Sequence, residues 1–231
     1  LDPDSNVQFG EGGAGTFSDG KLNTLVKDTF GRNQEVLKRF VDAGADPAIL
    51  YQQKPHLGTD VLISIVTTMR RQIEEMGGRF CFRSKVTDLK FENNALKSVV
   101  VNETEEIPAQ VCVLAIGHSA RDTFEMLYKK GISMEPKSFA VGLRMEHPQT
   151  MINEALYGEA ENPLLGAASY KVTHQTAEGR GVYSFCMCPG GYVVNAASEE
   201  GMLAVNGMSY SKRDGKNANS ALIITVTPED F

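Results

Sequence analysis

Hydrophobic residues in the first part of the chain recur at helical spacing. Apolar positions three or four residues apart predict amphipathic helices over 33–43 and 60–76. Thr59 and Asp60 provide an N-cap for the second helix, and Gly77 with Gly78 ends it.

Short apolar or alternating runs follow, and these predict an antiparallel β-meander. Asn93-Asn94 is a turn signal within it. The run Val111–Ile116 is continuously apolar, which predicts a strand buried on both faces and closed by Gly117. A helix is expected over 119–130. The predicted meander strands are 79–82, 86–91, 96–101 and 106–114.

The character of the chain changes at Lys137, because strand-like runs separated by Gly- and Asn-rich turns replace the mixed pattern. We therefore predict an α/β (α+β) chain with two domains, one over 1–135 and a β-rich one over 136–231. The strands expected in the second domain are 138–146, 168–173, 181–187, 191–197, 203–207 and 221–227.

Composition and net charge argue against some classes of binding partner. The chain has 231 residues and a formal net charge of −6, which disfavours a phosphate-backbone partner and therefore an RNA-modifying enzyme. No apolar run reaches the length of a membrane helix. With four cysteines in a chain long enough for a good core, a disulfide framework is not expected, so we predict a reducing, cytoplasmic compartment.

Residues 6–24 are too rich in glycine for a strand or helix and predict a loop. The stretch Gly15–Leu22 nearly matches the phosphate-binding loop of nucleotide hydrolases, but Leu22 stands where that loop needs Ser or Thr for magnesium. Gly10, Gly12 and Gly15 also have the spacing of a dinucleotide fingerprint, without a proper preceding strand.

Two interpretations of this glycine loop remain open beside those motifs. It can be a plain surface loop. It can also be a secondary cofactor loop, whose small residues let the backbone approach a pyrophosphate or flavin ring closely. In that case Ser18 and Lys21 would donate to ligand oxygens.

Cys186 and Cys188 lie two apart, and on a regular strand they would share a face and point together at a flavin or substrate. Burial as small hydrophobic side chains is the favoured alternative, and no second cysteine pair completes a zinc site. No metal is therefore expected.

Arg144 precedes the end of a predicted strand. It is a candidate clamp for a substrate carboxylate, although a strand-edge ion pair is slightly favoured. Among the histidines, His118 follows the predicted cofactor turn and could equally be a helix cap. His174 is expected in solvent, and His56 in a loop.

Several stretches together resemble bacterial proteins described as FAD- or NAD-utilizing dehydrogenases, and the resemblance covers nearly the whole chain. It is carried by Gly10–Leu22, Phe139–Gln149, Tyr183–Gly191 and Asn206–Ser211.

The resemblance implies the remainder of a doubly wound FAD-binding domain and a β-rich substrate-side domain. The main diphosphate-binding unit would lie before Leu1, and the closing FAD segment would lie after Phe231, so both ends are expected to be edges of an excerpt. The glycine loop and a turn at the end of the 111–117 strand would then pass beside FAD. The implied cofactor-contacting residues are Gly12, Gly13, Ala14, Gly15, Ser18, Gly20, Lys21, Val86, Ala115, Ile116 and Gly117.

Similar flavoproteins often have Ala-Thr-Gly at this turn, and Ile116 in place of Thr keeps a backbone role but removes a side-chain hydrogen bond. We expect the central part of an FAD-dependent oxidoreductase acting on a small-molecule substrate, with NAD(P)H as a candidate electron donor. Arg144, Cys186 and Cys188 are weak catalytic candidates. The alternative is a non-catalytic ligand-binding or assembly module on a degenerate flavoprotein scaffold.

Overall fold

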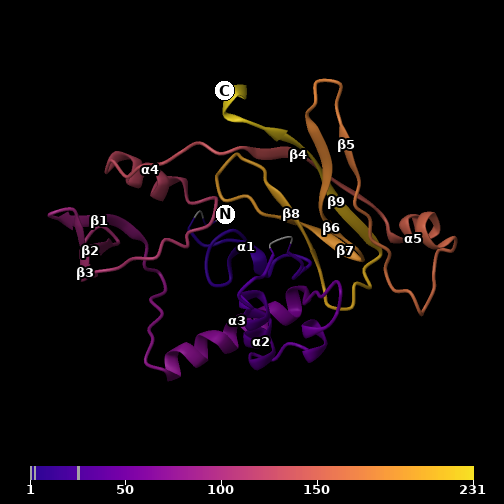
Figure 1. The fold of residues 1–231 in the computed structure, drawn as a ribbon, viewed down its shortest axis with the longest axis horizontal. Helices are drawn as coiled ribbons and strands as arrows, with labels where there is room; N and C mark the ends of the chain where they lie inside the picture. Colours follow the sequence, from indigo (N-terminus) through magenta and orange to yellow (C-terminus); the bar gives the residue numbers. More distant parts are fainter. Residues whose placement is uncertain (1, 3, 25–26) are drawn as a thin grey trace. The chain divides into compact units, whose positions relative to one another are not determined.

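A computed structural model describes residues 2, 4–24 and 27–231, so Leu1 lies outside the described residues. The chain divides into two compact units, which are described separately (Figure 1). Unit 1 combines residues 1–75 with 137–231, and unit 2 comprises 76–136. The proposed domain division at 135/136 stays a prediction.

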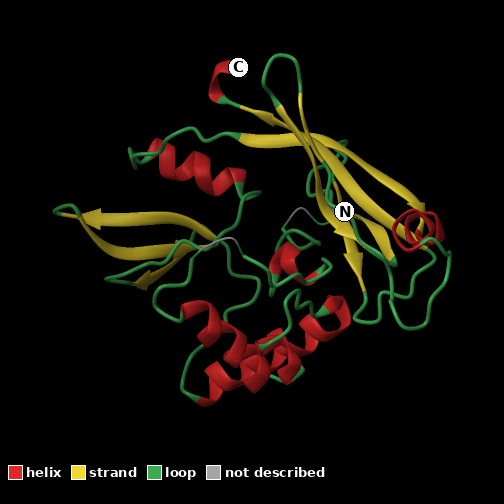
Figure 2. Cartoon of the chain, turned by 45° about the vertical axis from the view of Figure 1, so that its right-hand side comes forward, coloured by secondary structure: helices red, strands yellow, loops and turns green. Residues whose placement is uncertain are grey.

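The longer helices of unit 1 follow the apolar periodicity of its first 75 residues, whereas a one-turn helix at Gly13–Thr16 lies inside the glycine-rich stretch 6–24, which was predicted to hold no helix. The helices of this part of unit 1 are α1 (Gly13–Thr16), α2 (Arg32–Asp42), the short 3-10 helix η1 (Pro47–Leu50) and α3 (Gly58–Glu75). The predicted helices at 33–43 and 60–76 are thereby confirmed to within two residues. These helices lie together in one group (Figure 2). Their apolar sides meet around Ile49, Leu57 and Ile65, which are buried. This small core supports the loop that precedes α2.

A four-stranded antiparallel sheet forms the main β part of unit 1, in the order β4-β9-β6-β5 (Figure 1). The long strands β4 (Phe139–Pro148) and β9 (Asn217–Val226) pair along their whole length. Strand β6 (Gly181–Cys188) pairs with β9 and with the short β5 (Thr173–Gln175). A separate hairpin joins β7 (Gly191–Asn195) to β8 (Val205–Ser209).

The prediction for this β region was largely right, with two differences. Residues 168–172 are not a strand, and only 173–175 pair with β6 as β5. Helix α5 (Gln149–Tyr157) follows β4 and was not predicted. It begins directly after Pro148, whose fixed φ suits the start of a helix. The chain ends in the short 3-10 helix η2 (Pro228–Asp230).

Unit 2 is a three-stranded meander, β1 (Val86–Glu92), β2 (Ala95–Val101) and β3 (Glu105–Pro108), followed by α4 (Arg121–Lys129). Asn93 and Asn94 both adopt positive φ and form the two-residue turn between β1 and β2, as their type predicts.

Two predicted strands of unit 2 were wrong. Residues 79–82 are not a strand. The pairing of β1 with β2 begins at Val86 opposite Val101, and beyond Val101 the chain turns at 102–104 towards β3, so β2 offers no further residues to pair with 79–82. The run 111–116 is not a strand either, and it is exposed rather than buried, with Val111 81% and Val113 83% accessible. Pairing of β3 ends at Pro108, which has no N–H to continue the ladder.

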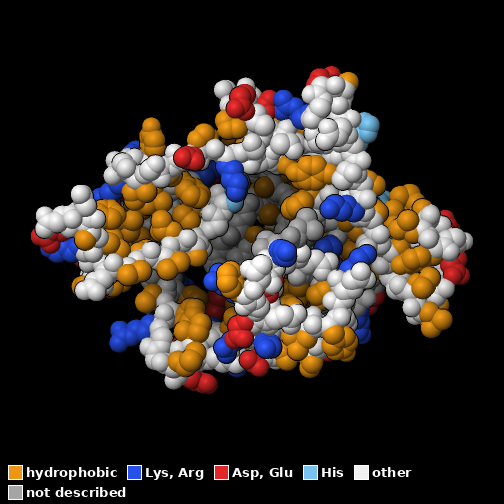
Figure 3. Space-filling view, viewed as in Figure 1, with side chains coloured by type: hydrophobic (Ala, Val, Ile, Leu, Met, Phe, Trp, Pro, Cys, Tyr) orange, Lys and Arg blue, Asp and Glu red, His pale blue; other side chains and the backbone are white. Residues whose placement is uncertain are grey.

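Unit 2 consequently exposes much apolar surface. Figure 3 shows hydrophobic side chains gathered over the meander. The exposed large apolar side chains of this unit are Met76, Phe80, Phe82, Phe91, Ile107, Val111, Val113, Leu114, Phe124, Tyr128 and Met134.

Candidate functional site

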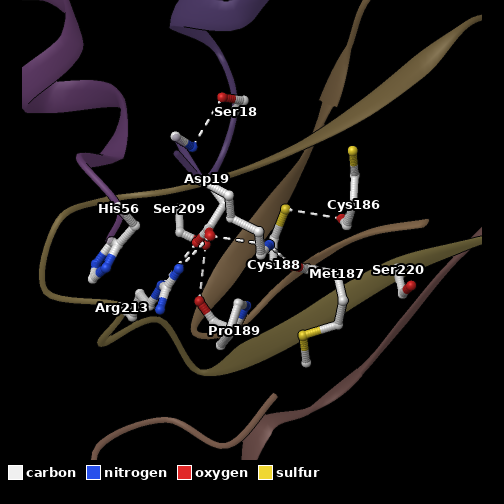
Figure 4. A network of polar contacts seen from close by, with 12 residues as sticks. Ser18, Asp19, His56, Cys186, Met187, Cys188, Pro189, Ser209, Arg213 and Ser220 are labelled. Carbon is white, nitrogen blue, oxygen red and sulfur yellow. Dashed lines mark hydrogen bonds and ion pairs between the residues drawn. The ribbon is translucent and has the colours of Figure 1, made fainter. Parts of the chain in front are cut away.

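The second half of the glycine loop is anchored on two sides within unit 1 (Figure 4). The Ser18 carbonyl accepts hydrogen bonds from Thr59 Oγ1 at 3.1 Å and from the Ser209 amide at 3.4 Å. Asn206 Nδ2 donates to the Phe17 carbonyl at 3.1 Å. The loop is thus tied both to the start of α3 and to strand β8.

Asp19 is the central charge of this anchor. Its side chain is only 3% exposed. Both of its carboxylate oxygens accept from the Arg213 guanidinium, with Nε to Oδ1 at 2.9 Å. Lys21 Nζ lies 3.0 Å from Asp19 Oδ2 and also donates to the Met187 carbonyl of β6. The buried carboxylate ties the loop to the Arg213 turn and Lys21 ties it to β6, and loss of Asp19 would leave both cations without their counter-charge.

The glycine-rich first half is open. Gly13 and Gly15 have no atom closer than 4.0 Å to the position of a Cβ, and Gly15 is exposed. Thr16 is buried, and its Oγ1 has no hydrogen-bond partner among the described residues. An open glycine backbone beside an unsatisfied hydroxyl suits the close approach of a ligand.

The two nucleotide motifs considered for this loop lack their structural context. Residues 4–10 form bends and turns, and no strand precedes the loop within the residues the structure describes. A phosphate-binding loop and a dinucleotide fingerprint both require such a strand. The geometry therefore disfavours both motifs.

Two predicted ligand donors are used within the protein. The Ser18 hydroxyl donates its proton to the Gly15 carbonyl at 2.7 Å and accepts from the Gly20 amide at 3.0 Å. Lys21 uses two of its three protons on Asp19 and Met187. Ser18 thus supports the loop in this conformation, and Lys21 retains one proton for a ligand.

Strand β6 is interrupted at the predicted cysteine pair. The register to β9 shifts between Phe185 and Cys188, and Cys186 has a φ of 46°. This bulge separates the two side chains, so that Cys186 is exposed and Cys188 is buried, with Cys186 directed away from Cys188 (Figure 4). The expectation that both thiols share a face was wrong, because it assumed a regular strand.

The surroundings of both thiols disfavour the thiolate. Burial raises the pKa of Cys188 to about 11, against the opposing effect of Lys21. The protein packed around its sulfur also raises the pKa of Cys186, although Lys21 and Arg144 lower it. Cys188 Sγ lies 3.2 Å from the Cys186 carbonyl. Cys188 therefore acts as a small buried side chain, as favoured from the sequence.

Arg144 is held from two sides. Its Nη1 donates to Asn219 Oδ1 at 2.7 Å and to the Cys186 carbonyl at 3.2 Å. Among the described residues Arg144 forms no strand-edge ion pair, and Glu146 accepts from Asn217 Nδ2 at 2.9 Å. A Cβ on Gly207 would collide with Arg144, Asn219 and Cys188, so only glycine lets β8 pack here.

Four of the predicted cofactor-contacting residues belong to unit 2. Val86 is half-buried and pairs with Val101 at the start of β1. Ala115 and Gly117 are exposed in irregular chain, Ile116 is half-buried, and Gly117 has a φ of 69° with open space around it. The role of these residues beside a cofactor stays a prediction.

A hollow of about 430 Å³ in unit 2 is a weaker candidate site. It is wide open, and its charged lining is already paired, with Lys130 on Asp88 and Lys129 on Glu125. Over the described part of the chain, no cluster of three His, Cys, Asp or Glu could hold a metal ion. There, too, no helix has the length and apolar character needed to cross a membrane.

Sequence reasoning missed the residues that anchor the site: Asp19, Arg213, Asn219 and Gly207. Asp19 lies inside the glycine loop, and an acidic residue there is a signal for an internal ion pair. Arg213, Asn219 and Gly207 have no local pattern that distinguishes them. The structure also places His56, expected in a loop, with its Nε2 3.0 Å from the Ser211 carbonyl.

This chain is similar to known proteins in two ways. Residues 138–231 match the family described as FAD-dependent protein, C-terminal domain-like. The chain is also 54% identical over 233 residues to a protein of Clostridium beijerinckii (strain ATCC 51743 / NCIMB 8052) described as "Uncharacterized protein". That similarity covers 100% of this chain and 43% of the relative, so the chain spans less than half of the relative's length. The β part of unit 1 is thus similar to FAD-dependent proteins.

Proposed function

We propose that this chain is the central part of an FAD-dependent oxidoreductase. One observation carries the proposal: a glycine loop that is open at Gly13 and Gly15 is fixed by Asp19 against a sheet region similar to FAD-dependent proteins. An anchored loop with free backbone surface is preorganised for a ligand, because little ordering entropy remains to be lost on binding.

The loop fits FAD in its steric and polar features. Gly13, Ala14 and Gly15 would bring the backbone close to the cofactor, and the remaining proton of Lys21 would be available to its oxygens. Bound FAD supplies hydride and electron transfer. In unit 2, Val86 and the turn Ala115–Gly117 are proposed to contribute backbone contacts. NAD(P)H is proposed as the electron donor.

The test uses the full-length parent protein. We expect a yellow protein with stoichiometric flavin absorbance that NADH or NADPH bleaches. The chain 1–231 alone is expected to bind FAD weakly or not at all, and a stoichiometric yellow colour would contradict that. A flavin-free parent that ignores nicotinamides would instead favour the non-catalytic module.

A matched pair of variants locates the cofactor. Gly15→Val adds a side chain where no atom lies within 4 Å, so it should fold but raise the Kd for FAD about tenfold or more, equivalent to about 1.4 kcal/mol. Gly181→Val is the control, because that glycine on β6 also has room, its nearest atom being 3.9 Å away. Equal effects of both variants on FAD binding would contradict the assignment of the loop.

A further inference from the structure

Arg144 is a half-buried cation without a carboxylate partner. Among the described residues, no Asp or Glu lies within ion-pair distance of its guanidinium, and its hydrogen bonds go to an amide and a carbonyl. By contrast, Arg180 in the same sheet is matched by Asp230, with Nη2 to Oδ1 at 2.6 Å. Taking a cation partly out of water is costly unless an anion accompanies it.

The charge around Arg144 is not balanced by its neighbours. Lys21 and Arg213 share the single carboxylate of Asp19. Glu146, on the same strand, is bonded by Asn217. Arg144 and Lys21 thus both contact the bulge of β6, while the Asp19 carboxylate beside them is shared with Arg213, which leaves an excess of positive charge there.

The bulge itself is arranged around these cations. Arg144 bonds the Cys186 carbonyl and Lys21 bonds the next carbonyl, that of Met187. Cys186 adopts a left-handed conformation that L side chains rarely take. Two cations from different parts of the chain thus meet at a strained, exposed residue, and such strain persists where the surrounding contacts over-determine it.

We propose that Arg144 and Lys21 form a binding site for the carboxylate group of a small-molecule ligand, beside the Cys186 thiol. Asn219 and the Cys186 carbonyl hold Nη1 in place, so the guanidinium is oriented before the ligand arrives. The planar guanidinium matches the two oxygens of a carboxylate, and Lys21 adds one further proton. So small a set of donors suits a singly charged carboxylate better than a phosphate dianion.

Cys186 provides the readout, so no flavin is needed. We would use the chain with Cys81→Ser and Cys112→Ser, which leaves the exposed Cys186 and the buried Cys188. Two disulfide reagents are compared: dithiobis(nitrobenzoate), with a carboxylate on each ring, and uncharged dithiodipyridine. The Cys186 thiolate attacks one reagent sulfur, a mixed disulfide forms, the aromatic thiolate leaves, and the thiol proton goes to the buffer.

Arg144→Gln should lower the ratio of the anionic to the neutral reaction rate about tenfold, equivalent to about 1.4 kcal/mol. Lys171→Gln removes an exposed lysine elsewhere in unit 1 and should leave the ratio within about twofold. Benzoate should slow the anionic reagent more than chloride does at equal ionic strength. Arg144→Lys should retain part of the preference, because it keeps the charge and loses the planar fork.

An unchanged rate ratio in Arg144→Gln would overturn the proposal, as would equal effects of benzoate and chloride on the chain that carries only the Cys81→Ser and Cys112→Ser changes. Stronger competition by inorganic phosphate than by benzoate would overturn the carboxylate assignment and indicate a phosphoryl ligand. If Arg144→Gln does not fold, Lys21→Gln and the benzoate competition decide the question. None of these measurements depends on FAD, so a failure here leaves the proposed flavoenzyme unaffected.

Discussion

Two small-residue stretches of this chain were expected to contact a cofactor, and they differ in how firmly the structure holds them. The loop Gly12–Lys21 is anchored by side chains from α3, β8 and the Arg213 turn. The stretch 111–117 is exposed chain without regular structure. The difference teaches that a loop can be fixed by a few side-chain contacts, whereas a strand exists only where another strand satisfies its backbone.

The largest effect is expected from breaking the anchor of the first stretch. Asp19→Asn leaves Arg213 and Lys21 without their buried counter-charge, so the free energy of unfolding should fall by about 3 kcal/mol. Urea denaturation followed by circular dichroism measures it. Asp88→Asn, which breaks a partly exposed pair with Lys130 in unit 2, should cost no more than about 1 kcal/mol. Equal losses would mean that Asp19 is not the anchor.

A smaller loss is expected from crowding the site behind the loop. Gly207→Ala places a Cβ against Arg144, Asn219 and Cys188, which should destabilise the chain by about 1 to 3 kcal/mol. Gly15→Ala, where space is open, should change stability by less than about 0.5 kcal/mol. Thermal denaturation of the two variants side by side tests this, and a tolerated Gly207→Ala would show that β8 does not pack closely there.

The contact between α3 and the 209–213 turn should make the stability of the folded chain depend on pH. Burial alone would raise the pKa of Asp60, but hydrogen bonds from the Ser211 hydroxyl and amide, at 2.7 and 2.9 Å, outweigh it and lower that pKa. The folded form therefore gains stability above the ordinary carboxyl pKa and loses it as the pH falls through the lowered value.

Ser211→Ala should cost about 1 kcal/mol at neutral pH, allowing for solvent screening. The difference from the unsubstituted chain should shrink in acid, where Asp60 becomes protonated. Unfolding free energies measured across the acid range check the sign. A penalty that does not depend on pH would indicate that the lost hydroxyl acts through packing instead.

The smallest effect is expected in the second stretch. Val113 is 83% exposed, so Val113→Asn should change the stability of the chain by less than about 0.5 kcal/mol. A loss above about 1 kcal/mol would show that the stretch is packed after all.

Local patterns were sufficient for the features that depend on neighbours in the sequence. Apolar periodicity predicted α2 and α3, and Asn93-Asn94 predicted the turn between β1 and β2, because helix faces and tight turns arise within a few residues. The glycine content of 6–24 predicted a loop, and the structure has one there apart from the single helical turn of α1. The similarity of residues 138–231 to FAD-dependent proteins agrees with the FAD dependence that the motifs suggested.

Tertiary structure alone decided the features that depend on distant partners. The bulge that separates Cys186 from Cys188 arises where β6 loses register with β9, and Arg144 is held by Asn219 and the Cys186 carbonyl and not by a carboxylate among the described residues. The run 111–116 has the composition of a buried strand, yet the pairing of β3 stops at Pro108. Hydrophobicity favours burial, but register and pairing are set by residues far away in the sequence, which no local pattern contains.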